Sequence, residues 1–179
     1  MSEALSAIPA DIACGLPETQ LAIRRAVLGL CRTMNWAAIN EFSLPAAGRR
    51  ADVMALLPDH SLICIEIKSG LRDFQTDQKW PEYRDWSDRL FFAVDDAFPV
   101  DLLPPDVGLI VVSVSAVPPA LREGVLAECT IIREPALHRL APARRRTLVH
   151  LFATTAASRL MGLEDPAITS SLRAARRAE

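Results

Sequence analysis

Two aliphatic stretches between residues 49 and 70, RRADVMALLPDHSLICIEIKSG, constrain the fold most, because each carries charged side chains in its middle. Their β-branched and aliphatic residues predict two β-strands joined by a short polar turn. Asp52 lies in the first strand, and Glu66 and Lys68 lie in the second. A buried charge costs several kcal/mol unless it is paired or coordinates a metal, so these three residues need a common explanation.

The length of the turn decides whether the two carboxylates share a face, because side chains alternate along a strand. If Leu57 pairs with Ser61 across the three-residue loop PDH, Asp52 lies opposite Glu66, and Lys68 follows on the same face. A two-residue turn would place the carboxylates on opposite faces. That tight turn has no special support, because LLPDHSL contains neither Asn-Gly nor Asp-Gly.

The preceding hairpin adds a third carboxylate. If PAAG is a four-residue loop, Leu44 pairs with Arg49, and Glu41 lies opposite Asp52. Three carboxylates on one rigid patch repel one another unless a cation binds them, and Mg²⁺ or Mn²⁺ prefers such oxygen ligands. The alternative is a simple buried ion pair between Asp52 and Lys68.

Composition narrows the class of protein. With 179 residues, half of them apolar, the chain suits one globular domain. The net charge of −2 argues against a non-specific nucleic-acid coat protein, so a phosphate backbone would have to be bound by a local patch. The four cysteines form no C-x-x-C pair and predict reduced thiols. No signal peptide and no apolar run of ~20 residues is present, so we expect a cytoplasmic protein without membrane contact.

The order of elements predicts a mixed α/β sheet with helices on both faces. We expect a loose lead-in over residues 1–16, one domain over 17–163 and a flexible tail over 164–179. Within the domain, the sequence predicts an opening helix, a three-strand meander, a polar loop leading into a helix near Pro81, two buried strands, an edge strand and a closing helix over 142–163. Leu148, Leu151, Phe152 and Leu160 are predicted to form the apolar side of that closing helix.

The residues in this order resemble a known family. An Asp in a hairpin followed by Glu-x-Lys, after one helix and before a helix and two strands, resembles the PD-(D/E)XK nuclease superfamily. Within it, GRRADVMAL, IEIKSGLRDFQTDQKWPEYRDWSDRLFFAV, LLPPDVGLIVV and LAPARRRTLVHLFATTAASRL are similar to the MmcB family of bacterial DNA-repair endonucleases. The resemblance covers residues 18–163. Ala51 stands where the superfamily name has proline, a position that varies in such nucleases.

The resemblance implies a restriction-endonuclease-like fold and a metal-dependent DNA endonuclease acting in DNA repair. It makes Asp52 and Glu66 ligands of Mg²⁺ or Mn²⁺ and Lys68 the catalytic lysine. The carbonyl of Ile67 would be a further ligand, and strand pairing adds Glu41 to the set. The alternative is a non-catalytic module on the same fold that binds DNA or recruits other repair proteins.

Basic and aromatic residues after Lys68 are candidates for DNA contact, because phosphates attract cations and bases stack on aromatic rings. We predict this role for Arg72, Lys79 and Tyr83. For Trp80 and Trp86, packing of the helix onto the sheet is the simpler explanation. For the arginines at 144–146, a solvated helix face is the simpler explanation, because positive charge at a helix start opposes the helix dipole.

Overall fold

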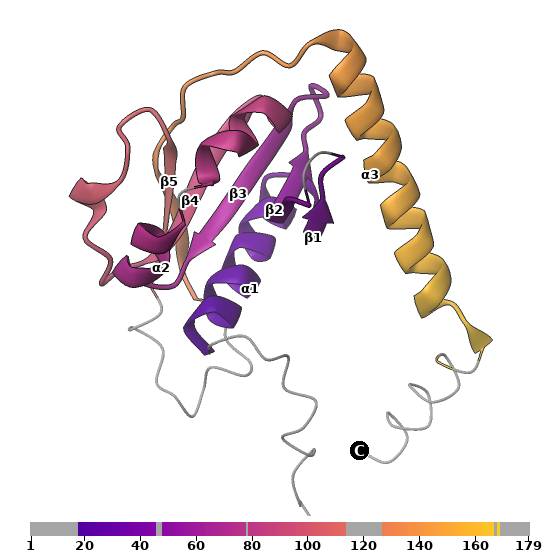
Figure 1. The fold of residues 1–179 in the computed structure, drawn as a ribbon. Coiled ribbons are helices and arrows are strands. Elements are labelled where there is room, and N and C mark those ends of the chain that lie inside the picture. Colours follow the sequence, from indigo (N-terminus) through magenta and orange to yellow (C-terminus); the bar gives the residue numbers. More distant parts are fainter. Residues whose placement is uncertain (1–17, 46–47, 78, 114–126, 167, 169–179) are drawn as a thin grey trace, which may run out of the picture.

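A computed structural model describes residues 18–45, 48–77, 79–113, 127–166 and 168 (Figure 1). The predicted lead-in over residues 1–16 lies outside them. The predicted elements occur in the predicted order, and α2 and η3 are added where loops were expected. The elements are α1 (Glu18–Thr33), β1 (Ala37–Ser43), β2 (Arg50–Leu56), β3 (Leu62–Lys68), α2 (Leu71–Thr76), the 3-10 helix η2 (Trp80–Trp86), β4 (Arg89–Asp95), the 3-10 turn η3 (Val100–Leu102), β5 (Gly108–Val112), β6 (Cys129–Arg133) and α3 (Pro142–Leu163).

The six strands form one sheet in the order β1-β2-β3-β4-β5-β6. The meander β1 to β3 is antiparallel, β4 and β5 add in parallel, and β6 closes the sheet as an antiparallel edge. All seven residues of β3 are buried, which is typical of a strand covered on both faces. The predicted mixed α/β sheet is therefore confirmed.

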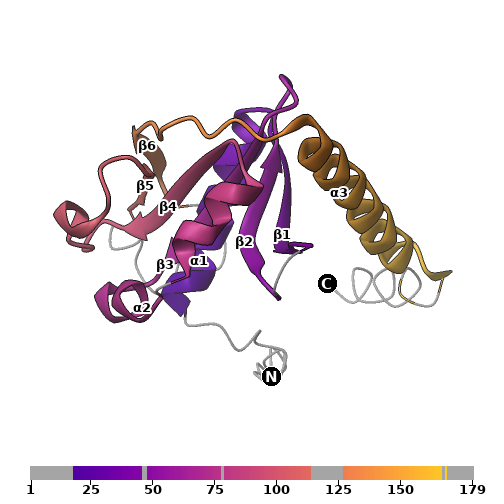
Figure 2. The same ribbon diagram turned by 45° about the horizontal axis from the view of Figure 1, so that its top comes forward.

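Helices cover both faces of this sheet. On one face α1 buries Ile23 and Val27 against the odd-numbered aliphatic side chains of β3. On the other face η2 and α3 pack against the sheet (Figures 1 and 2). The Phe42 ring of β1 meets the Phe152 ring of α3 with centroids 5.9 Å apart. The two clusters together form the hydrophobic core.

The closing helix has the predicted bounds, but its buried side is shorter than predicted. Leu148 and Phe152 are buried, and Leu151 packs against them half-buried. Leu160 was wrongly predicted to join them and is 54% exposed. Figure 2 shows why: α3 lies beside β1 at the edge of the sheet, and its last turns have no strand beneath them.

Two further expectations concern the whole chain. In the described part of the chain, no helix is both long and apolar enough to cross a membrane. Cys31 and Cys64 are buried and Cys129 is half-buried, and all three are free thiols. Cys14 lies outside the described residues.

Candidate active site

The β2–β3 hairpin has the predicted register. The Leu57 N–H donates to the Ser61 carbonyl at 2.9 Å, which closes the three-residue loop. His60 occupies the left-handed region with φ 64°, as the last residue of such loops does. The paired positions run from Leu56 and Leu62 to Val53 and Ile65, so the next two opposed residues are Asp52 and Glu66.

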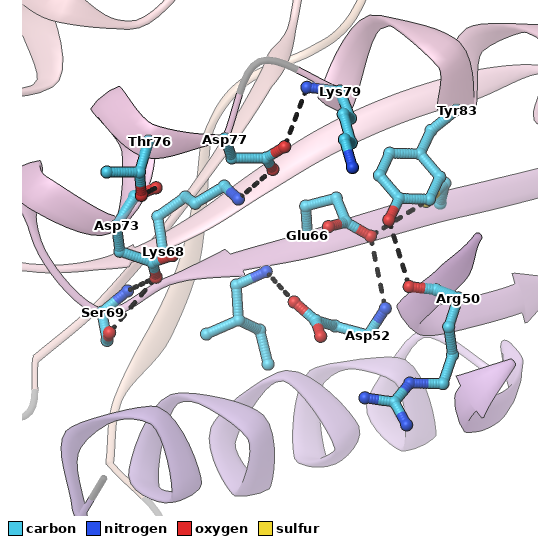
Figure 3. A network of polar contacts seen from close by, with 12 residues as sticks. Arg50, Asp52, Glu66, Lys68, Ser69, Asp73, Thr76, Asp77, Lys79 and Tyr83 are labelled. Carbon is cyan, nitrogen blue, oxygen red and sulfur yellow. Dashed lines mark hydrogen bonds and ion pairs between the residues drawn. The ribbon is translucent and has the colours of Figure 1, made fainter. Parts of the chain in front are cut away.

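At this pair, side chains replace the backbone ladder. The Asp52 N–H donates to Glu66 Oε1 at 3.3 Å, and the Ile67 N–H donates to Asp52 Oδ2 at 2.8 Å (Figure 3). Each carboxylate thus satisfies an amide of the opposite strand where the two strands separate. These bonds use one oxygen of each carboxylate, and Asp52 Oδ1 and Glu66 Oε2 are the oxygens available to a further ligand.

Both carboxylates resist ionisation. Burial, and then the charge of Asp52, raises the pKa of Glu66 to about 8, although Lys68 partly offsets them. Glu66 is only 4% exposed. Burial also raises the pKa of Asp52, against the hydrogen bond from the Ile67 N–H. A positive charge placed between the two groups would relieve both costs.

Lys68 does not supply that charge directly. Its side chain is 5% exposed, and its Nζ lies 2.5 Å from Asp77 Oδ2 and 6.0 Å from the centre of the Phe92 ring. Asp77 follows the end of α2. In the part of the chain that the structure describes, no ion pair joins Glu66 to a lysine or arginine.

Glu41 lies in the predicted register opposite Asp52, between the pairs Asn40–Val53 and Phe42–Ala51. Its backbone is in the left-handed region with φ 49°. The strand is therefore kinked here, and the side chains of Ile39 and Phe42 enter the same core although they are three residues apart.

At the kink, the Glu41 side chain lies beside two arginine side chains. Its carboxylate forms ion pairs with Arg24 of α1 and with Arg50 of β2. A metal bound by Glu41 would have to compete with both arginines. Its role as a ligand stays a prediction.

The chemistry of the remaining donors fits a hard divalent cation. Within the described residues, no three side chains of Asp, Glu, His or Cys form a ready-made metal site. Mg²⁺, however, is commonly held by only one or two carboxylates, with water and substrate phosphates completing its shell. Asp52, Glu66 and the carbonyl of Ile67 offer that set, and within the described residues neither carboxylate forms an ion pair with a lysine or arginine.

The three residues predicted to contact DNA have different environments. Arg72 and Lys79 are exposed, and Figure 3 shows the Lys79 side chain pointing into the space between Asp77 and Tyr83. Tyr83 differs from the expectation, because it is only 7% exposed and its hydroxyl donates to the Arg50 carbonyl at 3.1 Å. Burial raises the pKa of Tyr83. Its ring packs in the core and does not offer a face for stacking on a base.

The two tryptophans pack as expected. Trp80 is half-buried, and its ring meets Phe92 edge-on at 5.4 Å between centroids. Trp86 is also half-buried, with the Arg144 guanidinium 4.9 Å from the centre of its ring. Arg144 is therefore more than part of a solvated helix face.

Sequence reasoning missed two structural partners. Asp77, directly after α2, binds Lys68. Arg145 makes two hydrogen bonds to Asp88, at 2.6 and 2.7 Å. Neither pairing follows from spacing, because both depend on the path of loops. The one available signal was the need of a buried lysine, Lys68, for a counter-charge.

Fold and site together define an open mixed α/β sheet in which the half-buried Asp52 of β2 lies opposite the buried Glu66 of β3, with the buried Lys68 farther along β3. The family model described as DNA repair protein MmcB-like matches residues 7–167, and the chain belongs to this family. The solved structure of the SPO1766 protein of unknown function from Silicibacter pomeroyi is 39% identical with a TM-score of 0.72. That match covers 84% of this chain and 94% of the other. The architecture is consistent with a restriction-endonuclease-like fold. A comparison with curated proteins finds no match.

Proposed function

We propose that the protein is a metal-dependent DNA endonuclease that acts in DNA repair. The observation that carries this proposal is the separation of β2 and β3 at Asp52 and Glu66. There, the buried Glu66 carboxylate accepts the Asp52 N–H, and the half-buried Asp52 carboxylate accepts the Ile67 N–H. Among the described residues, no lysine or arginine forms an ion pair with either carboxylate. Membership of a DNA repair family supports the choice of DNA as substrate. The resemblance to PD-(D/E)XK nucleases supports the choice of reaction.

Each residue has a definite task in this proposal. Asp52, Glu66 and the Ile67 carbonyl hold Mg²⁺ or Mn²⁺. When bound, the ion lowers the pKa of a water ligand and neutralises charge on the scissile phosphate. Lys68 adds positive charge beside the reacting phosphate and orients the attacking water.

The exposed cations extend the site toward the DNA strand. Lys79 is exposed, with its side chain drawn between Asp77 and Tyr83 in Figure 3, and binds a neighbouring phosphate. Arg72, exposed on α2, contacts the backbone farther along. Tyr83 contributes indirectly, because its hydroxyl fixes the backbone of Arg50 two residues before Asp52.

The first test is calorimetric titration of Mn²⁺ and Mg²⁺ into the protein and its Glu66→Ala variant. Binding should disappear in Glu66→Ala and persist in Glu134→Ala, which removes an exposed carboxylate beyond β6. If no binding occurs without DNA, the titration is repeated with a DNA oligonucleotide in which a phosphorothioate blocks cleavage.

The second test is cleavage of single-stranded, duplex and branched DNA with Mn²⁺. Glu66→Ala and Lys68→Ala should abolish cleavage while circular dichroism shows a folded protein. Full activity in either variant would refute the assignment. A protein that cleaves none of these DNAs but loses repair function on changes at Lys79 would instead be the non-catalytic DNA-binding or partner-recruiting module.

A further inference from the structure

We propose that Asp77 is a positioning residue that holds the Lys68 ammonium away from the Asp52–Glu66 pair and so keeps that pair free for a cation. The inference rests on the proposed function, because it treats the pair as the cation site. It adds a residue that the family resemblance does not assign.

The first support is the environment of Lys68. A buried lysine requires a counter-charge, and Asp77 provides it at 2.5 Å. The ammonium also lies 6.0 Å from the centre of the Phe92 ring, and among the described residues no second carboxylate forms an ion pair with it. The position of the Lys68 charge therefore depends on Asp77.

The second support is that Asp77 is itself fixed. Its other oxygen, Oδ1, accepts the Lys79 N–H at 2.9 Å. Its own N–H donates to carbonyls of α2, those of Asp73 and Phe74, at 3.3 Å. The carboxylate of Asp73 in turn accepts the N–H and hydroxyl of Ser69, directly after β3. Asp77 is thereby tied back to the strand that carries Lys68.

The third support is that Lys68 has a competing partner close by. Glu66 and Lys68 project from the same face of β3, about 7 Å apart along the strand, which is within the reach of a lysine side chain. Lys68 already acts electrostatically on both Asp52 and Glu66. Without Asp77, an ion pair with Glu66 becomes the best way to neutralise a buried ammonium. A metal ion would then have to displace it.

The test compares Asp77→Asn with Asp101→Asn. Asp101→Asn is the control, because it makes the same chemical change at an exposed carboxylate outside the network of Asp73, Asp77 and Lys68. In a crystal structure of metal-free Asp77→Asn we expect Lys68 Nζ within about 4 Å of a Glu66 or Asp52 oxygen. Calorimetry should show Mn²⁺ binding at least about tenfold weaker in Asp77→Asn, a change typical of residues that share one network.

The double variant Asp77→Asn/Lys68→Met separates positioning from folding. It leaves no lone buried charge, so it should fold even if Asp77→Asn does not, and it should bind Mn²⁺ at least as tightly as the unaltered protein. A merely structural role of Asp77 predicts no such recovery.

The outcomes distinguish this inference from the proposed function. Lys68 remaining beside residue 77 in the Asp77→Asn crystal, or unchanged Mn²⁺ affinity in that variant, would overturn the inference. Failure of the unaltered protein to bind Mn²⁺, with or without DNA, would overturn the proposed function. The crystal structure would still decide where Asp77 holds Lys68.

Discussion

Two acidic centres lie at opposite ends of β3, and their carboxylates have different hydrogen-bond and ion-pair partners. At the start of the strand, Asp88 accepts hydrogen bonds from the Leu62 N–H, the Leu140 N–H and both terminal nitrogens of Arg145. Toward the end of the strand, the carboxylates of Asp52 and Glu66 accept backbone amides, and no guanidinium or ammonium of the described residues forms an ion pair with them. The first centre has a directly bound cation, and the second does not.

The two centres also titrate in opposite directions. Burial alone would raise the pKa of Asp88, but hydrogen bonds from Arg145 and from two backbone amides outweigh it and lower that pKa. At Glu66 burial prevails and raises the pKa to about 8. The Asp88 centre links β3 to α3 and to the segment before α3. At the Asp52–Glu66 centre, ionisation of the carboxylates is unfavourable, and a bound cation can relieve that cost. The comparison assigns stability to Asp88 and function to Glu66.

The largest expected effect on stability is that of Asp88→Ala. The variant leaves the Arg145 guanidinium and two backbone N–H groups without their acceptor, and we expect a loss of about 3 kcal/mol in the free energy of unfolding. The estimate is at the low end for a buried ion pair, because Arg145 is 29% exposed. Urea denaturation measures it, with the exposed Asp101→Ala as control. A loss of unfolding free energy no larger than that of the control would refute the assignment of a stabilising role to Asp88.

The acid limb of the stability curve checks the same centre. A carboxyl with a lowered pKa stabilises the fold at pH values above its usual 3.8 and loses that effect as pH falls through the folded value. The difference between the unaltered protein and Asp88→Ala should therefore shrink below pH 4.

The next effect concerns metal affinity and pH. Glu66 must lose its proton before it can act as a ligand, so below pH 8 the apparent Mn²⁺ affinity should fall about tenfold per pH unit. Calorimetry at pH 6, 7 and 8 in buffers of different ionisation heat measures both the affinity and the released proton. An affinity independent of pH would show that Glu66 is already ionised or is not a ligand.

A smaller effect of opposite sign is expected for Glu66→Gln. Between pH 4.5 and 8 the folded protein keeps a proton on Glu66 that the unfolded chain releases, so stability falls as pH rises across this window. The glutamine variant removes that loss. Its Tm in the presence of a chelator should exceed that of the unaltered protein by on the order of 5 °C at pH 9 and match it near pH 4. A lower Tm at pH 9 would contradict the raised pKa.

The smallest effect is expected for Glu82→Gln. Glu82 receives two hydrogen bonds from Arg49, at 2.7 and 2.9 Å, so it is a paired carboxylate like Asp88, although Arg49 donates through Nε and Nη2. Half of the Glu82 side chain is exposed, so water and salt replace the lost pair. No measurable change in Tm is expected. A loss like that of Asp88→Ala would show that burial is not what separates the two pairs.

The sequence by itself determined the pairing of β2 with β1 and β3, and therefore the central pair. Turn lengths in PDH and PAAG set the register, and a period of two then brings Asp52, Glu66 and Glu41 to adjacent positions. Aliphatic and helical periodicity likewise predicted α1, α3 and the six strands, whereas α2 and η3 lie where loops were expected. The predicted features are local relations between residues close in sequence, so turn lengths and side-chain periodicity were sufficient to predict them.

Only the tertiary structure decided which groups neutralise which charges. In the structure, Lys68 forms an ion pair with Asp77, Glu41 pairs with two arginines, and Asp88 pairs with Arg145. Tyr83 is buried, and Leu160 is exposed. The physical reason is that these contacts join elements across loops and across the edge of the sheet. Their geometry follows from how helices dock on the sheet, which residue spacing does not encode.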